Sequence, residues 1–352
     1  MRWNPAWLVT LVALVAVGCG GGDGGRNDGD GDTLTDTTVV GDDDDDDVSH
    51  STTPWTEVET TQAECCRSVE LSFEFTETGS EELGRWAYAV PEGPIGAVVV
   101  FHGSNGSIAA VQQTEWLELY NLLYPRGIGL ILVNSTDRDT KQWSEEPVGA
   151  NPDVDAVEAV LAEVSATTAW DIDDPLISIG FSNGAKFANL FAEDAKLRGR
   201  DVKGAVMHQG SFDGLGEGLP GLWVSAENDD AGGGPERMDD NATAQGNGSL
   251  HLRGTEVALH PNRFAKIPSV QPEESQAYFD YLVEEKIIDA DGWRLFAFDA
   301  DPDEQADGLE RYLPFPAITE VVTQLRVVWA IHRFSAQHKV EEAAWIEAQL
   351  LR

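Results

Sequence analysis

The sequence predicts an α/β fold with a doubly wound, mostly parallel sheet. Beyond residue 66, short apolar runs typical of strands alternate with amphipathic stretches typical of helices. Two of these runs, AVVVF at 97–101 and IGLILV at 128–133, are apolar throughout, as expected of strands that are buried on both faces. The chain of 352 residues is long enough to bury such a sheet in one large domain.

The remaining strand and helix signals alternate along the chain in the way that this architecture requires. Asn151 and Pro152 have the residue types of a helix start, and the apolar spacing of 154–164 indicates one buried helix face. In chain order, we predict strands at 68–75 and 85–90, helices at 108–124 and from 152, a strand at 176–179, a helix at 183–197, and strands at 205–207, 222–225 and 256–259.

The N-terminal part of the chain has the composition of an export signal followed by a tether. Residues 1–19 carry a positive start and an apolar run too short to span a bilayer, which is typical of a signal peptide. Its end resembles a bacterial lipobox, so Cys19 is the predicted lipidation site of a protein exported to the outer membrane or cell surface; ordinary secretion is the alternative. Residues 20–64 are rich in Gly and Asp and predict a disordered linker.

The cysteine content and the charge limit the possible classes of protein. Cys65 and Cys66, whether bonded to each other or free, are too few for a disulfide scaffold. We do not expect them to form a metal site, because no histidine or further cysteine lies at the spacing of metal ligands. Residues 65–352 hold 48 acidic and 21 basic residues. This field repels polyanions, so we expect neutral substrates and no nucleic-acid partner.

A serine between two glycines is the strongest chemical signal in the chain. The segment GFSNG at 180–184 follows the predicted strand LISI and opens the predicted helix at Asn183. This setting is typical of a nucleophile elbow, in which small flanking residues allow a sharp turn that exposes the serine hydroxyl. Ser182 is therefore the candidate nucleophile, and an ordinary turn rich in small residues is the alternative.

A nucleophilic serine requires backbone N–H groups that stabilise the oxyanion of its intermediate. One donor is expected from Asn183 and the second from a loop that follows an earlier strand. The segment FHGSNG closes the strand AVVVF in that position, so Ser104 is the candidate second donor. His102 in this segment is equally compatible with a packing role.

The acid should follow the serine in the chain and lie at the end of a strand. The strand LWVS runs into the sequence Ala-Glu-Asn-Asp-Asp at 226–230. Asp229 is the candidate acid of the triad, and Asp230 and Glu227 are its alternatives.

The base should be a histidine that follows the acid in the chain. The stretch TEVAL at 255–259 predicts the final strand, which places His260 at the same edge of the sheet as the serine. His260 is therefore the candidate base. His251 precedes that strand, and His332 lies on the apolar face of a late predicted helix, where a packing role is expected.

Together these segments resemble the α/β-hydrolase superfamily, and within it the secreted esterases related to polyhydroxybutyrate depolymerases and feruloyl or acetylxylan esterases. The closer resemblance rests on FHGSNG, on Trp143 ahead of Asp153-Val-Asp155, on Asp171-Ile-Asp173 and on GFSNGA. It implies an α/β-hydrolase fold and a serine esterase that forms an acyl-enzyme without metal or organic cofactor. The chain departs from the family after the acid-bearing strand, where Gly-Thr-x-Asp is usual, and in the histidine loop, which lacks the common glycines.

The predicted organisation is a signal peptide at 1–19, a linker at 20–64, a catalytic domain at 65–290 and a C-terminal helical extension at 291–352. We expect the extension to pack on the catalytic domain; a surface for a partner is the alternative. The expected partners are an ester substrate and, through the lipid on Cys19, a membrane. Two other functions compete with the esterase: a peptidase or amidase on the same fold, and a surface binding protein that keeps the fold without the activity.

Overall fold

The computed structural model describes residues 69–80, 83–147, 149–210, 214–216, 218–229, 234–297, 302–311 and 313–352. The predictions for Cys19, Cys65, Cys66 and the N-terminal boundaries lie outside these residues. All described residues belong to one compact unit, so the helices expected at 291–352 are part of the same body as the sheet. No helix of the described part is long and apolar enough to cross a membrane.

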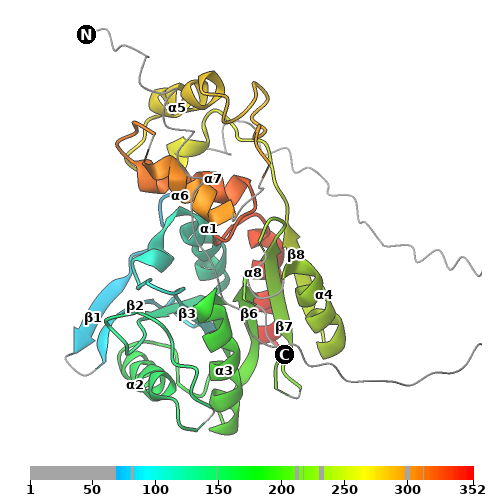
Figure 1. Ribbon diagram of the computed structural model, residues 1–352. Coiled ribbons are helices and arrows are strands. Elements are labelled where there is room, and N and C mark those ends of the chain that lie inside the picture. Colours follow the sequence, from blue (N-terminus) through cyan, green and yellow to red (C-terminus); the bar gives the residue numbers. More distant parts are fainter. Residues whose placement is uncertain are drawn as a thin grey trace, which may run out of the picture. The chain divides into compact units, whose positions relative to one another are not determined.

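An eight-stranded sheet forms the centre of this unit (Figure 1). In spatial order, its strands are β1 (Thr76–Ser80), β2 (Gly84–Ala89), β4 (Ile128–Val133), β3 (Gly96–Phe101), β5 (Leu176–Phe181), β6 (Val202–His208), β7 (Gly221–Ala226) and β8 (Leu250–Gly254). In this order the strands from β4 to β8 are parallel, whereas β2 pairs antiparallel with both β1 and β4. The predicted mostly parallel sheet is therefore confirmed.

Helices cover both faces of the sheet, as the predicted doubly wound architecture requires (Figure 1). One face carries α2 (Pro152–Thr167), α3 (Asn183–Leu197) and α4 (Gly234–Gln245). The other face carries α1 (Thr114–Leu123) and α8 (Lys339–Leu350). Because the central strands are buried on both sides, their sequences are apolar without alternation.

The start of α2 shows how a local signal becomes structure. The side-chain oxygen of Asn151 accepts hydrogen bonds from the backbone N–H groups of Asp153, at 2.9 Å, and Val154, at 3.3 Å. Pro152 occupies the first turn, where its missing N–H costs no hydrogen bond. The predicted N-cap is confirmed.

Two predicted strands are wrong. The described residues 69–75 form no strand, and Phe73 instead stacks on Tyr124 with 4.2 Å between ring centroids. The last strand is β8 rather than 256–259. Its sequence, LHLRG, lacks an apolar run because β8 is a partly exposed edge strand. Beyond β8 the chain leaves the sheet, and the N–H of Val257 donates to the carbonyl of Val328 at 2.8 Å.

The described residues between 259 and 331, which we call the cap, have an apolar core of their own. The cap contains the helices α5 (Pro272–Glu284), α6 (Pro302–Glu310) and α7 (Ile318–Val328), which lie together beyond the end of the sheet (Figure 1). It contacts the loop after β7, where the backbone N–H of Asn228 donates to the carbonyl of Ala330 at 2.9 Å. The cap therefore covers the carboxyl ends of the parallel strands.

Candidate active site

Ser182 occupies the sharp turn between β5 and α3. Its backbone angles, φ 56° and ψ −120°, lie in a region that residues other than glycine rarely adopt. The backbone N–H of Ser182 donates to the carbonyl of His208 at the end of β6, at 2.9 Å. Such a strained strand-to-helix turn is the geometry of a nucleophile elbow.

Crowding explains both glycines of GFSNG. A Cβ at Gly180 would lie 1.9 Å from the carbonyl oxygen of Gly184, and a Cβ at Gly184 would lie 2.3 Å from the carbonyl oxygen of His102. The strand end, the turn and the first helical turn thus meet backbone against backbone. This packing favours the elbow over an ordinary turn.

We expect Gly184→Ala to lower the free energy of unfolding by about 1–3 kcal/mol, because backbone atoms must move to make room for the methyl group. Gly308→Ala in α6 is the matched control, since a Cβ there meets no atom within 4 Å. It should leave stability unchanged or raise it by about 0.4–1 kcal/mol. Thermal melts of the two variants test this expectation, and equal melting temperatures would contradict it.

A chain of two hydrogen bonds joins Ser182 to a carboxylate through His332. Ser182 Oγ lies 2.9 Å from His332 Nε2, and His332 Nδ1 lies 2.9 Å from Asp229 Oδ2. The side chain of Asp229 is 5% exposed, whereas that of His332 is 20% exposed. With Nδ1 donating to the carboxylate, Nε2 is left to accept the serine proton, which is the arrangement that activates a serine hydroxyl.

The structure contradicts the prediction that His260 is the base. His332 fills the position between Ser182 and Asp229, whereas His260 Nδ1 accepts a hydrogen bond from the backbone N–H of Asn262 at 3.1 Å. The prediction is wrong because it placed the final strand at 256–259. These residues are not in the sheet, so His260 does not follow a strand of the sheet.

The structure brings the candidate acid Asp229 to Ser182, although through a different histidine. Of its two alternatives, Glu227 accepts a hydrogen bond from the backbone N–H of Glu256 at 3.1 Å, and Asp230 lies outside the described residues.

His332 could not be assigned from the sequence, because no residue marks the end of α7. Ala330 has φ 50°, its N–H donates to the carbonyl of Val327 at 3.2 Å, and the N–H of Ile331 donates to that of Arg326 at 3.0 Å. This is a Schellman ending, in which glycine usually takes the left-handed position. Because alanine takes this position instead, the apolar pattern of the sequence continues beyond the end of the helix at Val328, and His332 looks like a helical residue. The chain order serine, acid, histidine keeps His332 as a candidate, but it admits His251 and His260 equally and could not select among them.

Two side chains at strand ends hold the segment that carries His332. Gln209, directly after β6, donates from Nε2 to the backbone carbonyl groups on both sides of His332, at 2.7 and 3.4 Å. Asn228, the neighbour of Asp229, donates through its side chain to the carbonyl of Trp329 at 2.7 Å. The histidine segment is therefore fixed to the same strand ends that hold the elbow and the carboxylate.

The two candidate oxyanion donors lie after neighbouring strands of the sheet, β5 and β3. Asn183 is the first residue of α3, and Ser104 lies in the turn that follows β3. Within the described part of the chain, neither backbone N–H donates a hydrogen bond to another residue. Both groups are thus available for a substrate oxygen.

His102 shapes the turn that carries Ser104. Its Nδ1 donates to the carbonyl of Gly103 at 2.8 Å, and its Nε2 accepts from the backbone N–H of Ser135 at 3.2 Å. Burial lowers the pKa of His102 to about 4, so the ring stays neutral near pH 7, as this pair of hydrogen bonds requires. Its role is to position the turn.

A second serine, histidine and aspartate lie in contact on β7, β8 and α4. Ser225 Oγ lies 2.8 Å from His251 Nε2, and His251 Nδ1 lies 3.3 Å from Asp239 Oδ1. Ser225, however, is 3% exposed and belongs to the regular strand β7. Without an elbow the hydroxyl is not presented to a substrate, so we interpret this contact as a structural link between β7, β8 and α4.

A cavity of about 480 Å³ is lined by the Ser104 turn and by Phe181, the residue that precedes Ser182. Its body side is partly aromatic, with Trp116, Phe181 and Phe334, and the rings of Trp116 and Phe334 stack with 3.5 Å between centroids. The cap contributes a polar wall from one face of α7, formed by Thr319, Glu320, Thr323 and Gln324.

Glu115 at this cavity ties the cap to the body. Arg263 of the cap donates to its carboxylate at 2.8 Å, and so does the backbone N–H of Ala336 at 3.0 Å, just beyond the His332 segment. Burial alone would raise the pKa of Glu115, but Arg263 and Lys266 outweigh it and hold that pKa below its usual value. The carboxylate therefore stays charged and links three parts of the chain.

No protein-family model and no curated protein matches the chain. Similar solved structures include an esterase from Pyrobaculum calidifontis, with 16% identity, 59% of this chain and 82% of that chain covered, and a TM-score of 0.38. An α/β serine hydrolase without a lid from Xanthomonas campestris has 14% identity, coverage of 62% and 96%, and a TM-score of 0.37. A thermostable esterase from Pseudomonas putida has 17% identity, coverage of 60% and 83%, and a TM-score of 0.39.

The fold of this chain is the α/β-hydrolase fold. Its sheet is mostly parallel, an elbow follows β5, and the serine, the carboxylate and the histidine come together at the carboxyl ends of the strands in that chain order. The closer resemblance to polyhydroxybutyrate depolymerases and feruloyl or acetylxylan esterases stays a prediction.

Proposed function

We propose that the protein hydrolyses carboxylic esters through Ser182. The observation that carries this proposal is the pair of hydrogen bonds from Ser182 through His332 to Asp229 at a strained elbow. As Oγ attacks the ester carbonyl carbon, His332 accepts the hydroxyl proton. Asp229 holds the imidazole ring in place and stabilises its protonated form.

The same residues act in the release of the alcohol and in the hydrolysis of the acyl-enzyme. The backbone N–H groups of Ser104 and Asn183 stabilise the negative oxygen of the tetrahedral intermediate. When the intermediate collapses, the alcohol leaves with the proton from His332, and the acyl group stays on Ser182. Water then attacks the acyl-enzyme while His332 accepts its proton, and the acid departs as Ser182 recovers its hydrogen.

Matched ester and amide substrates separate this function from its competitors. We expect p-nitrophenyl acetate to be hydrolysed with a kcat/KM roughly a hundredfold or more above that of p-nitroacetanilide, since an amine is the poorer leaving group. Comparable values would favour a peptidase or amidase. Turnover of neither substrate would favour the binding protein that keeps only the fold.

We further propose that a lipid on Cys19 anchors the protein outside the cytoplasm, on the basis of the apolar run and lipobox-like end of residues 1–19. The full-length protein should partition into the detergent phase of a Triton X-114 separation, because several acyl chains give stable anchoring. Cys19→Ala should move it into the aqueous phase. Aqueous partitioning of both proteins would indicate ordinary secretion instead.

A further inference from the structure

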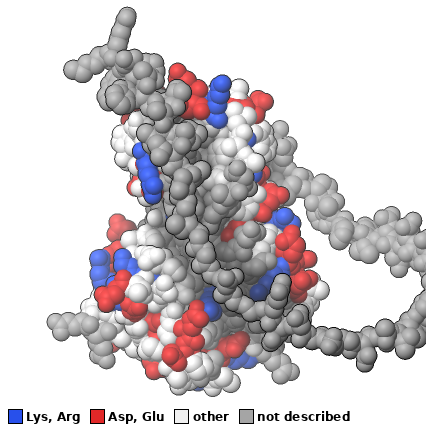
Figure 2. Space-filling model, viewed as in Figure 1, with Lys and Arg blue, Asp and Glu red and all other residues white. Residues whose placement is uncertain are grey.

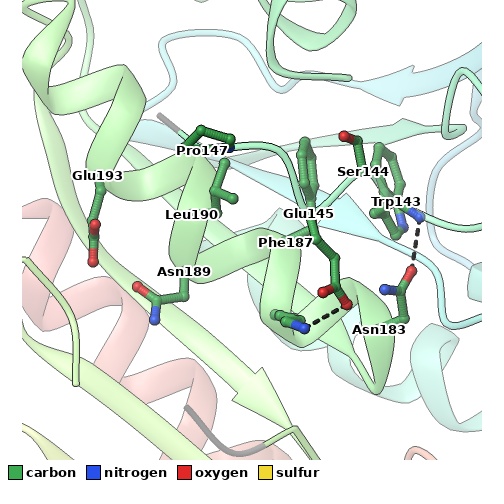
Figure 3. Close-up of a pocket in the computed structure, with 10 residues that line it drawn as sticks. Trp143, Ser144, Glu145, Pro147, Asn183, Phe187, Asn189, Leu190 and Glu193 are labelled. Carbon is green, nitrogen blue, oxygen red and sulfur yellow. Dashed lines mark hydrogen bonds and ion pairs between the residues drawn. The ribbon is translucent and has the colours of Figure 1, made fainter. Parts of the chain in front are cut away.

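The two candidate oxyanion donors lie on different segments of the chain, and one buried residue contacts both segments. Asn183 begins α3, whereas Ser104 lies in the turn after β3. Trp143 belongs to neither segment, since it lies in the loop between β4 and α2. Its backbone N–H donates to Asn183 Oδ1 at 2.7 Å (Figure 3), and its indole N–H donates to the carbonyl of His102 at 2.7 Å. Trp143 therefore bridges the elbow and the Ser104 turn.

The hydrogen bond to His102 acts at the start of the Ser104 turn. Because a peptide group is planar, an indole that holds the carbonyl of His102 also fixes the direction of the next N–H, that of Gly103. The elbow packs against the same carbonyl, since a Cβ at Gly184 would lie 2.3 Å from its oxygen. A rotation of this peptide group would therefore change both the course of the chain toward Ser104 and its packing against the elbow.

Trp143 is itself held firmly. Its indole ring stacks on Phe187 of α3 with 4.4 Å between ring centroids, and it meets Phe101 of β3 edge to face at 4.9 Å. The residue is 2% exposed. The next residue, Ser144, donates its backbone N–H to Asp153 Oδ2 at 2.6 Å, in the first turn of α2. The bridge between the two segments is therefore rigid.

Three other buried tryptophans do not use the indole N–H in this way. The indole N–H groups of Trp86, Trp170 and Trp223 have no hydrogen-bond partner among the described residues. All three belong to the same apolar core as Trp143. This core thus accepts a tryptophan for its apolar surface alone. Trp143, by contrast, has both of its N–H groups on acceptors next to the candidate oxyanion donors.

We propose that Trp143 is a positioning residue for the oxyanion site. It holds the Ser104 turn against the elbow, so that the backbone N–H groups of Ser104 and Asn183 point at one substrate oxygen. This inference rests on the proposed function of Ser182. The two hydrogen bonds of Trp143 do not involve the hydroxyl, the imidazole or the carboxylate of the site. Their loss should therefore weaken stabilisation of the oxyanion and leave proton transfer intact.

Two substrates that differ in one atom report on the oxyanion: p-nitrophenyl acetate, and its thiono analogue, in which sulfur replaces the carbonyl oxygen. Sulfur is a weak hydrogen-bond acceptor, so the thiono ester gains little from oxyanion donors. Both esters are neutral, so the acidic side chains that Figure 2 shows over the surface affect them alike. The ratio of their acylation rates in single-turnover kinetics therefore measures how well the donors are placed.

Trp143→Phe removes the indole N–H and keeps an aromatic ring beside Phe187. We expect this variant to acylate with p-nitrophenyl acetate roughly ten- to a hundredfold more slowly than the wild type, because a displaced donor stabilises the oxyanion less. Its rate with the thiono ester should stay within about threefold. Inhibition by phenylboronic acid, which adds to Ser182 as a tetrahedral anion, should weaken by a factor similar to that for the acetate.

Trp170→Phe is the matched control. It removes the same atoms from the same core without the loss of a hydrogen bond to a described residue. Both variants should lower the melting temperature, but only Trp143→Phe should lower the ratio of the two acylation rates. Asn183→Ala breaks the other hydrogen bond of Trp143 at a half-buried position. It should lower the ratio as well, and it tests the bridge even if Trp143→Phe does not fold.

The outcomes separate the failure of this inference from that of the esterase. If Trp143→Phe slows both esters equally, or if Trp143→Phe or Asn183→Ala keeps the wild-type ratio, Trp143 is a packing residue only and the esterase stands. If Trp170→Phe lowers the ratio as much as Trp143→Phe, the effect comes from lost core volume, which also overturns the assignment. If the wild type hydrolyses neither ester and phenylboronic acid does not bind, the proposed function fails, and this inference with it.

Discussion

Ser182→Ala should abolish ester hydrolysis, with turnover of p-nitrophenyl acetate reduced by roughly 10⁵-fold or more, because no other group on the elbow can form the acyl-enzyme. The residual rate would come from the oxyanion donors and substrate binding. The circular dichroism spectrum and melting temperature should change little, since the side chain lies at a turn. A fluorophosphonate should add one adduct to the wild-type protein, on Ser182, and none to the variant.

Ser225→Ala is the matched control for this experiment. Ser225 contacts His251, which in turn contacts the carboxylate of Asp239, but Ser225 is buried in β7 and is not on an elbow. We expect this variant to keep its activity and to accept the fluorophosphonate on Ser182. An adduct on Ser225, or substantial turnover by Ser182→Ala, would contradict the assignment of the nucleophile.

The second large effect is expected at the base. His332→Gln should lower kcat/KM by roughly 10⁴-fold or more, because glutamine cannot accept the proton of Ser182. The oxyanion donors remain in place in this variant, so binding of substrate should be affected far less than turnover. Single-turnover kinetics with p-nitrophenyl acetate measure the acylation step on which His332 acts.

His260→Gln is the comparison that decides between the two histidines. His260 lies in the cap, with its Nδ1 bonded to the backbone of Asn262, so its replacement should leave acylation within a few-fold of the wild-type rate. If His260→Gln is inactive while His332→Gln is active, the hydrogen bonds of the site do not represent the catalytic arrangement.

Local signals explain why the elbow could be predicted and the base could not. Gly180 and Gly184 mark the elbow because a Cβ at either position would collide with the backbone, and that requirement is visible in five consecutive residues. Asp229 could be predicted because parallel strands end at one edge of the sheet. His332 lies 150 residues after Ser182 in the chain. It follows a helix at whose end an alanine takes the left-handed conformation that glycine usually has.

The edge strand β8 and the cap could not be predicted from the sequence for a different reason. The strand β8 is partly exposed, so its residues do not show the apolar run that identifies a buried strand. The stretch 256–259 does look apolar, but it packs with the cap: Val257 pairs with Val328, and Leu259 belongs to the cap core. Within this stretch only Leu259 is buried, and Val257 is 39% exposed, so apolar composition alone decides neither the burial of a side chain nor the core that receives it.

The cap has a thermodynamic consequence for activity. It has its own apolar core and joins the body through polar contacts that include the ion pairs of Arg263 with Glu115 and of Lys266 with Glu118, so it is a candidate for local unfolding below the free energy of global unfolding. His332 follows α7 by four residues, so detachment of the cap would withdraw the histidine from Ser182. On heating, turnover should then disappear before the sheet melts, and cooling should restore it while the elbow remains folded.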